Sequence, residues 1–165
     1  MTTSNSLSLD TKKTQEIVFG SSHTLNLFRQ LNISKVEVNC LGDSVPFVDE
    51  VTSLGVILDS TLSWVSQVQH VTKKVNRALY GLKVIRPWTS LSLRKRLIES
   101  LVVPYLNYCC LVYSDTTKNL SGQLQRLLNS SIRYIYGIRH DEHITPYELD
   151  ACYNQERLLC ISNHI

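Results

Sequence analysis

The spacing of hydrophobic and polar positions changes at Asp59 and divides the chain into two parts. After Asp59, apolar residues recur every three or four positions, which is the period of an amphipathic helix. The first apolar face consists of Val68, Val71, Val75, Ala78, Leu79 and Leu82. Ser63 is the predicted N-cap of this helix, and Pro87 is its predicted end.

Two further helices are predicted downstream. Ser92 is expected to cap the second, and Pro104 either kinks or divides it before residues 105–113. Its apolar positions are Leu93, Leu97, Ile98 and Leu101. The third helix runs from about Asn119 and ends at Gly137. Its apolar stripe is Leu120, Leu124, Leu127, Leu128, Ile132 and Ile135.

Another helix is predicted near the end of the chain. Thr145 as a cap, Pro146 in the first helical position and Glu148 three residues after the cap form a helix-start signature. Residues 155–165 stop in mid-pattern, without a closing Gly or Pro, which suggests that the chain is truncated relative to its ancestor.

The part before Asp59 shows the spacing of short strands and turns. Strands are predicted at 17–19, 35–39, 45–48 and 53–58, with turns at 20–22 and 42–43. The expected arrangement is a β-hairpin beside one further strand, with Pro46 at a strand start or edge because it cannot donate to the ladder. The predicted fold class is α+β: a small antiparallel β-hairpin element in residues 1–59, then a helical bundle in residues 60–165.

The composition indicates where in the cell the protein is found, but it gives little information about its binding partners. With 165 residues and a net charge of +3, the chain suits one domain or two small modules, and its charge alone says little about partners. The cysteines show no Cys-x-x-Cys spacing, so neither a disulfide framework nor a standard zinc site is indicated. An intracellular location, in the nucleus or cytoplasm, is expected. No apolar stretch approaches the roughly 20 residues that span a bilayer, so no membrane partner is expected.

The distribution of charge is more informative than its sum. No acidic residue lies between Asp59 and Glu99, a window that contains Lys73, Lys74, Arg77, Lys83, Arg86, Arg94, Lys95 and Arg96. A second acid-free window, between Asp115 and Asp141, contains Lys118, Arg126, Arg133, Arg139 and His140. Two such windows on successive helices could form one positive surface for phosphates. The alternative is a pair of solvated helix faces.

Aromatic residues accompany the basic windows. Tyr80, Trp88, Tyr105 and Tyr134 could stack on sugars or bases. Aromatic residues on helices more often belong to the core, so both interpretations remain open.

The acidic residues do not form a catalytic pattern. Nucleotidyl transfer requires carboxylates that hold two divalent cations, and the chain has no Asp-Asp pair. The adjacent acids Asp49-Glu50 and Asp141-Glu142 fall in predicted loops. The spacing of His140, His143, Cys152, Cys160 and His164 matches no structural zinc module. We therefore expect no catalytic residue, no metal ligand and no enzymatic activity in this chain.

Several short motifs follow one another in a recognisable order. They are Leu-Asp-Thr-Lys-Lys-Thr (9–14), Val-Pro-Phe-Val (45–48), Leu-Gly-Val-Ile-Leu-Asp (54–59), Leu-Ser-Trp (62–64), Pro-Tyr (104–105), Leu-Gln-Arg (124–126) and His-Ile-Thr-Pro (143–146). Their order resembles the C-terminal part of the reverse transcriptase of a jockey-like non-LTR retrotransposon. The fingers, most of the palm, the catalytic Asp-Asp turn and the endonuclease of that family have no counterpart in the sequence.

The resemblance implies a role for each part of the chain. Residues 1–59 would be the end of the palm, with 45–48 and 54–59 as a primer-grip hairpin, and residues 60–165 would be a truncated thumb. Lys13 would lie near the incoming triphosphate, although Thr11 stands where the family commonly has proline. Gly55 would let the backbone approach a nucleic-acid strand closely.

The leading hypothesis is a fragment of an RNA-directed DNA polymerase that has lost catalysis and at most holds a primer-template, RNA-DNA or DNA, without sequence preference. The expected contact residues are Lys73, Lys74, Arg77, Lys83, Arg94, Lys95, Arg126, Arg133 and Gly55. No cofactor is expected, since Mg²⁺ would serve only an intact parent polymerase. The alternatives are a non-functional remnant and a helical protein-interaction module, in which Ile17, Phe19 and Val56 would form an apolar surface that self-associates.

Overall fold

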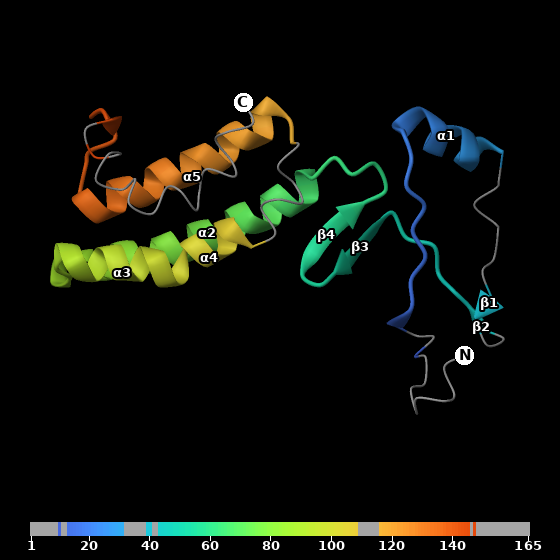
Figure 1. Ribbon diagram of the computed structural model, residues 1–165, viewed down its shortest axis with the longest axis horizontal. Helices are drawn as coiled ribbons and strands as arrows, with labels where there is room; N and C mark the ends of the chain where they lie inside the picture. The colour runs from blue at the N-terminus through green and yellow to red at the C-terminus, as the bar shows by residue number, and fades with distance from the viewer. Residues whose placement is uncertain are drawn as a thin grey trace. The chain divides into compact units, whose positions relative to one another are not determined.

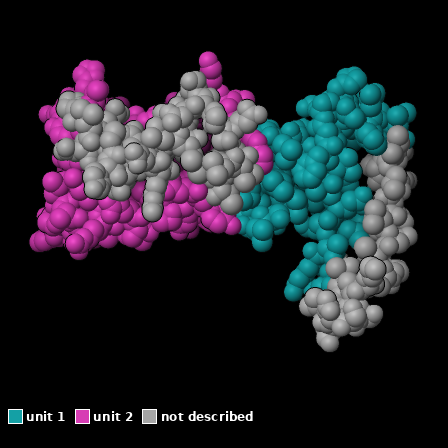
Figure 2. Space-filling model, viewed as in Figure 1, with its two compact units in different colours: residues 1–63 teal, residues 64–165 magenta. Residues whose placement is uncertain are grey.

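The chain has an α+β fold, which confirms the predicted class. The computed structural model describes residues 10, 13–31, 39–40, 43–108, 116–145 and 147. Two compact units, residues 1–63 and 64–165, are distinguished by their internal contacts (Figure 2). The first unit ends at Ser63, whereas the change of sequence pattern placed the boundary at Asp59.

The second unit is a helical bundle (Figure 1). Its elements are α2 (Val65–Ile85), the short 3-10 helix η4 (Arg86–Trp88), α3 (Leu91–Leu101), α4 (Val103–Asn107) and α5 (Lys118–Tyr136). Helix α5 packs along α2, α3 packs against α5, and α4 packs against α2. The described helices include none that is both long enough and apolar enough to cross a bilayer.

The core of this unit forms where the predicted apolar stripes meet. From α2 it takes Val68, Val71, Val75, Leu79 and Leu82, and from α5 Leu120, Leu124, Leu127, Tyr134 and Ile135. Ile98, Val102 and Leu106 close it from the α3 and α4 side. Leu93 and Leu101, two of the four apolar positions noted for this helix, are exposed. Arg94, one turn before Ile98, takes the inward position instead.

Glycine and proline mark helix ends in this unit as predicted. Gly137 ends α5 with φ 78°, a left-handed conformation that favours glycine. Pro104 lies in the first turn of α4, so it divides two helices and does not kink one. The cap of α3 is Ser90, whose Oγ accepts a bond of 3.4 Å from the Leu93 N–H. The predicted cap at Ser92 is therefore wrong, since Ser92 already lies within the helix.

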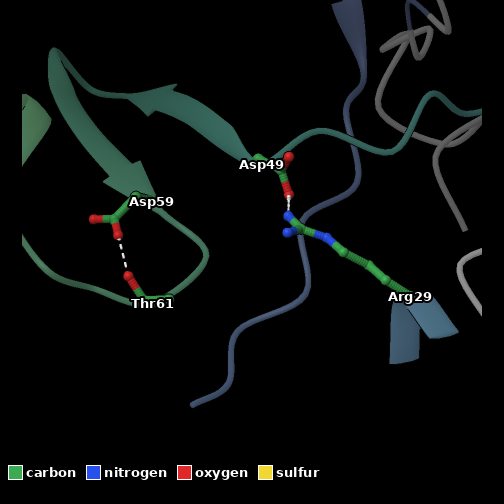
Figure 3. Close-up of polar contacts among 4 residues, drawn as sticks. All are labelled: Arg29, Asp49, Asp59 and Thr61. Carbon is green, nitrogen blue, oxygen red and sulfur yellow. Dashed lines mark hydrogen bonds and ion pairs between the residues drawn. The ribbon is translucent and has the colours of Figure 1, made fainter. Parts of the chain in front are cut away.

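The start of α2 also differs from the prediction. Trp64 occupies the cap position with φ 62° and makes no side-chain cap bond. Ser63, the predicted cap, lies one position earlier, and its N–H donates to Asp59 Oδ2 at 3.1 Å. The Thr61 hydroxyl donates to the same carboxylate oxygen (Figure 3). Asp59 therefore organises the chain leading to α2.

Helix α1 (Ser22–Gln30) lies in the first unit and was not predicted; only its first residue falls in the turn predicted at 20–22. Ser21 caps it by accepting a bond of 3.2 Å from the Thr24 N–H, and Leu25 is buried. The predicted strand at 17–19 is wrong, because the chain makes only an isolated parallel bridge between Glu16 and Phe47.

The first unit contains two short antiparallel hairpins within its described residues. Strands β3 (Glu50–Ser53) and β4 (Val56–Asp59) pair with Ser53 opposite Val56. The range predicted as one strand, 53–58, therefore contains the end of β3, a turn and most of β4, and the partner of β4 is β3 and not 45–48. The reason is that both residues of the turn, Leu54 and Gly55, have positive φ, at 48° and 80°.

The second hairpin joins β1 (Asn39–Cys40) to β2 (Asp43–Ser44), with Cys40 opposite Asp43. Asp43 therefore lies in a strand, although the sequence placed it in a turn. Residues 35–38 of the strand predicted at 35–39 lie outside the described residues.

A few polar contacts tie the first unit together. Pro46, expected at a strand edge, offers its carbonyl to the Glu16 N–H at 3.0 Å, and Gly20 N–H donates to Ser60 O at 3.0 Å. Arg29 Nη2 lies 2.6 Å from Asp49 Oδ1 (Figure 3). Both partners of this pair are more than half exposed, so it contributes little stability.

Several predictions fall wholly or partly outside the described residues. They concern residues 9, 11 and 12, the ranges 109–113 and 148–165, and every cysteine except Cys40. At the predicted helix start, Thr145 and Tyr147 are helical, and Tyr147 N–H donates to Ile144 O at 2.8 Å. Thr145, which was expected to be the cap, is therefore already helical.

Candidate nucleic-acid interface

One face of α2 combines basic and aromatic side chains. Lys73, Arg77, Tyr80 and Val84 are spaced three or four residues apart, and Trp88 follows Val84 by four residues in η4. All are exposed, with exposed fractions of 74% for Tyr80, 65% for Val84 and 88% for Trp88. We call these five residues the α2 stripe.

Helical periodicity accounts for the stripe. Residues three and four apart share one face of a helix, and Val71 and Val75, each two residues from a stripe position, occupy the opposite, buried face. Lys73 and Arg77 pair with no acidic side chain in the part of the chain that the structure describes. The stripe therefore offers two free positive charges beside exposed apolar side chains.

The exposure of each aromatic residue shows whether it is available for stacking or belongs to the core. Tyr80 and Trp88 lie at the surface and not in the core. Tyr134, in contrast, is only 2% exposed, so the suggestion that it stacks on a base is wrong. Tyr105 is partly exposed and lies under a lysine: Lys74 Nζ is 5.5 Å from its ring centroid. A cation-π contact of this kind contributes about 0.5–1 kcal/mol at an exposed site.

The predicted basic residues outside the stripe fall into two groups. Lys74, Lys83 and Arg126 are exposed. Lys95 is half-buried, with its Nζ 5.3 Å from the centroid of the Tyr136 ring. The charged groups of these residues therefore lie at or near the surface of the second unit.

Arg94 and Arg133 belong to the second group, because their guanidinium groups bind main-chain carbonyls. Arg94 donates to Thr89 O at 2.8 and 3.0 Å and to Ile135 O at 3.2 Å, which joins the start of α3 to the end of α5. Arg133 donates to the carbonyls of Arg139 and Glu142. Both arginines satisfy acceptors near helix ends, a structural role that their place in the acid-free windows did not reveal.

The structure also gives the positions of the predicted functional residues in the first unit. Lys13 is exposed and lies 3.4 Å from Asp10 Oδ2. Gly55 is exposed in the β3–β4 turn, where its positive φ accounts for glycine without any ligand. Val56 is only 6% exposed, so it cannot belong to the apolar surface suggested for self-association. Phe19 is 48% exposed and Ile17 is half-buried.

The described acidic residues do not form a cluster that could bind a metal ion. Asp49 pairs with Arg29, and Asp141 lies 3.6 Å from Arg139. Within the described ranges, no three His, Cys, Asp or Glu side chains are grouped so that they could hold a metal ion.

Sequence reasoning missed a second basic feature. A cavity in the second unit is lined by Lys83, Arg86, Ser130, Arg133, Tyr134 and His140. The sequence showed only that these residues lie in the two acid-free windows. Their convergence depends on how the end of α2 meets the end of α5, for which no sequence pattern gives a signal.

Comparisons with models of known protein families, with curated proteins and with solved structures found no match to this chain. A function must therefore be inferred from its own residues and geometry.

Proposed function

We propose that this chain is a nucleic-acid-binding fragment of a jockey-like non-LTR retrotransposon reverse transcriptase, and that its helical unit grips a primer-template as a thumb. The observation that carries the proposal is the α2 stripe. It places Lys73 and Arg77 beside Tyr80 and Trp88 on one solvent face. The order of the sequence motifs supplies the family.

The chemistry of the stripe suits a nucleic-acid strand. Lysine and arginine bind phosphates and release condensed counterions, which makes affinity depend on salt. Exposed aromatic rings stack on bases, with about 1–3 kcal/mol per base. Contacts of both kinds tolerate any sequence, so the proposed partner is RNA-DNA or DNA primer-template without sequence preference.

The proposed role is holding the nucleic acid and not chemistry. The sequence contains no Asp-Asp pair to bind the metal ions of nucleotidyl transfer. Mg²⁺ would serve an intact parent polymerase, in which a separate part of the protein carries the catalytic carboxylates. Mg²⁺-dependent primer extension by the purified chain would contradict this role.

A salt series with matched variants tests the proposal. Binding of an RNA-DNA hybrid is measured for the wild type, for the double variant Lys73→Ala/Arg77→Ala and for the control Arg96→Ala/Lys118→Ala. The control removes the same charge from exposed positions outside the stripe. We expect the stripe variant to reduce the slope of log K against log salt by about 0.9 for each phosphate that it no longer neutralises. The control should keep the wild-type slope, and equal slopes in all three proteins would refute the proposal.

Self-association is a second candidate, favoured by exposed apolar side chains on α1. Leu27 and Phe28 are 43% and 40% exposed, and Leu31, just after the helix, is 67% exposed. Size-exclusion chromatography with and without nucleic acid separates the two functions. A stable dimer that is indifferent to nucleic acid would favour this candidate.

A further inference from the structure

A cavity of about 430 Å³ in the second unit is lined in part by basic residues. Lys83 comes from α2, Arg86 from η4, Arg133 from the last turn of α5, and His140 from the segment after α5. The volume lies within the roughly 300–1000 Å³ of small-ligand pockets. No acidic residue is among its described lining residues. The electrostatic character of the cavity therefore favours an anion.

Two buried polar atoms at this cavity have no partner among the described residues. They are the hydroxyl oxygen of Tyr134, a residue only 2% exposed, and Nε of Arg86. An unsatisfied buried polar group costs about 1–3 kcal/mol, and more when it is charged. An acceptor inside the cavity would remove this cost for both groups.

The neighbouring arginines have acceptors within the protein itself. Arg94 and Arg133 donate to main-chain carbonyls, which accounts for positive charge near the ends of α2 and α5. Arg86 Nε has no such acceptor in the part of the chain that the structure describes. The Arg86 guanidinium instead lies against Gly137, where an added Cβ would clash with Arg86 Nη2. The absence of a side chain at Gly137 thus leaves room for Arg86 at this place.

The backbone of Arg86 is held firmly beside the cavity. Its carbonyl accepts bonds from Thr89 N–H at 3.2 Å, from Thr89 Oγ1 at 2.9 Å and from Arg94 Nη2 at 3.4 Å. Main-chain contacts of this kind fix the point from which the Arg86 side chain extends, so the donors of the cavity are arranged before any ligand arrives.

We propose that this cavity binds a phosphate monoester group. Arg86 and the Tyr134 hydroxyl donate hydrogen bonds to the phosphate oxygens, and the positive charges of Lys83 and Arg133 lie in the same lining, together with the polar side chain of His140. A phosphate presents acceptor oxygens in several directions, which suits donors that arrive from α2, η4 and α5. The site does not include Lys73 or Arg77 of the α2 stripe, and it does not depend on the proposed function.

Binding of inorganic phosphate to the full chain tests the site. The thermal midpoint and the calorimetric affinity are measured at constant ionic strength, with chloride as the reference anion. Phosphate should raise the midpoint of the wild type and of the control Lys73→Ala equally. Arg86→Met should abolish this effect. Phosphate that stabilises the protein no more than chloride does would overturn the proposal.

Tyr134→Phe keeps the test valid if the Arg86 variant does not fold. It removes only the unpartnered hydroxyl, so the unliganded protein should be at least as stable as the wild type. Its phosphate affinity should fall about ten-fold, as expected for one hydrogen bond to a charged group. Unchanged affinity in a folded Tyr134→Phe protein would overturn the proposed contact.

Two oligonucleotides identify the source of the phosphate. If the cavity takes the end of a strand, a 5′-phosphorylated oligonucleotide should bind more tightly than its 5′-hydroxyl form, and Tyr134→Phe should remove the difference. Equal affinities, together with inorganic phosphate binding, assign the site to a small phosphate ester. These results are independent of the salt slope measured with the Lys73→Ala/Arg77→Ala variant, so each proposal can fail separately.

Discussion

At the scale of single residues, Gly137 is placed where a side chain would both strain the backbone and collide with a neighbour. We predict that Gly137→Ala destabilises the protein by about 2 kcal/mol or more, since a left-handed alanine costs about 1–2 kcal/mol before the clash with Arg86 is added. Gly122→Ala is the control, because an added Cβ meets nothing within 4 Å inside α5. It should stabilise by about 0.5–1 kcal/mol. Urea denaturation measures both, and equal effects would contradict the account.

Leu54 carries strain of the same kind in the β3–β4 turn. Its φ is 48° although its side chain is 88% exposed, so no burial compensates for the left-handed conformation. We predict that Leu54→Asn stabilises the protein by about 1 kcal/mol, because asparagine tolerates this region and Asn-Gly favours such turns. Gly55→Ala should destabilise it. Denaturation curves that show Leu54→Asn to be less stable than the wild type would be inconsistent with this turn.

Residue type predicted exposure well for Lys73 and Arg77 but not for Arg94. An arginine in an acid-free window suggests a solvent-facing charge, yet the Arg94 guanidinium turns inward because carbonyls of Thr89 and Ile135 lie within its reach. One of these acceptors belongs to α5. A contact between helices distant in sequence leaves no trace in local spacing.

At the scale of elements, mutation of Ser90 and Ser92 tests which of the two residues caps α3. Ser90→Ala should lower the free energy of unfolding by about 1 kcal/mol, because its Oγ accepts from the Leu93 N–H. Ser92→Ala, two residues later inside the helix, should change it by much less. Thermal unfolding of the two variants provides the measurement. The reverse order would restore Ser92 as the cap.

Trp88 tests the aromatic part of the α2 stripe. Trp88→Ala should weaken binding of a single-stranded oligonucleotide by about 1–3 kcal/mol, whereas Trp88→Phe should retain most of the affinity because the ring can still stack. The salt slope should remain unchanged in both, since no charge is removed. Fluorescence anisotropy at several salt concentrations checks both points. A Trp88→Ala protein that binds as tightly as the wild type would exclude stacking at this residue.

The long helices were predictable and the short elements were not. Helix α2 repeats its apolar period over many turns, so Val68, Val71, Val75, Leu79 and Leu82 identify its buried face. Helix α1 was missed because Ser21 and Ser22 are typical of turns as well as of helix caps. The β3–β4 hairpin was displaced because leucine at position 54 gives no sign of the positive φ that the turn requires.

At the scale of the whole molecule, the α+β class and a helical second unit followed from the change of period at Asp59. The arrangement of helices within that unit did not. Periodicity shows which face of a helix is apolar, but it does not show that η4 brings Arg86 beside Gly137 and Tyr134. The basic cavity is therefore a product of tertiary packing, whereas the α2 stripe can be recognised from the sequence once the helix is known.

The most direct test of the central claim is the affinity of the wild-type chain for an RNA-DNA primer-template across a salt series. The account predicts binding whose log K falls linearly with log salt, by about 0.9 for each phosphate neutralised. An affinity that does not respond to salt, or no binding at low salt, would contradict a nucleic-acid-gripping role for the α2 stripe.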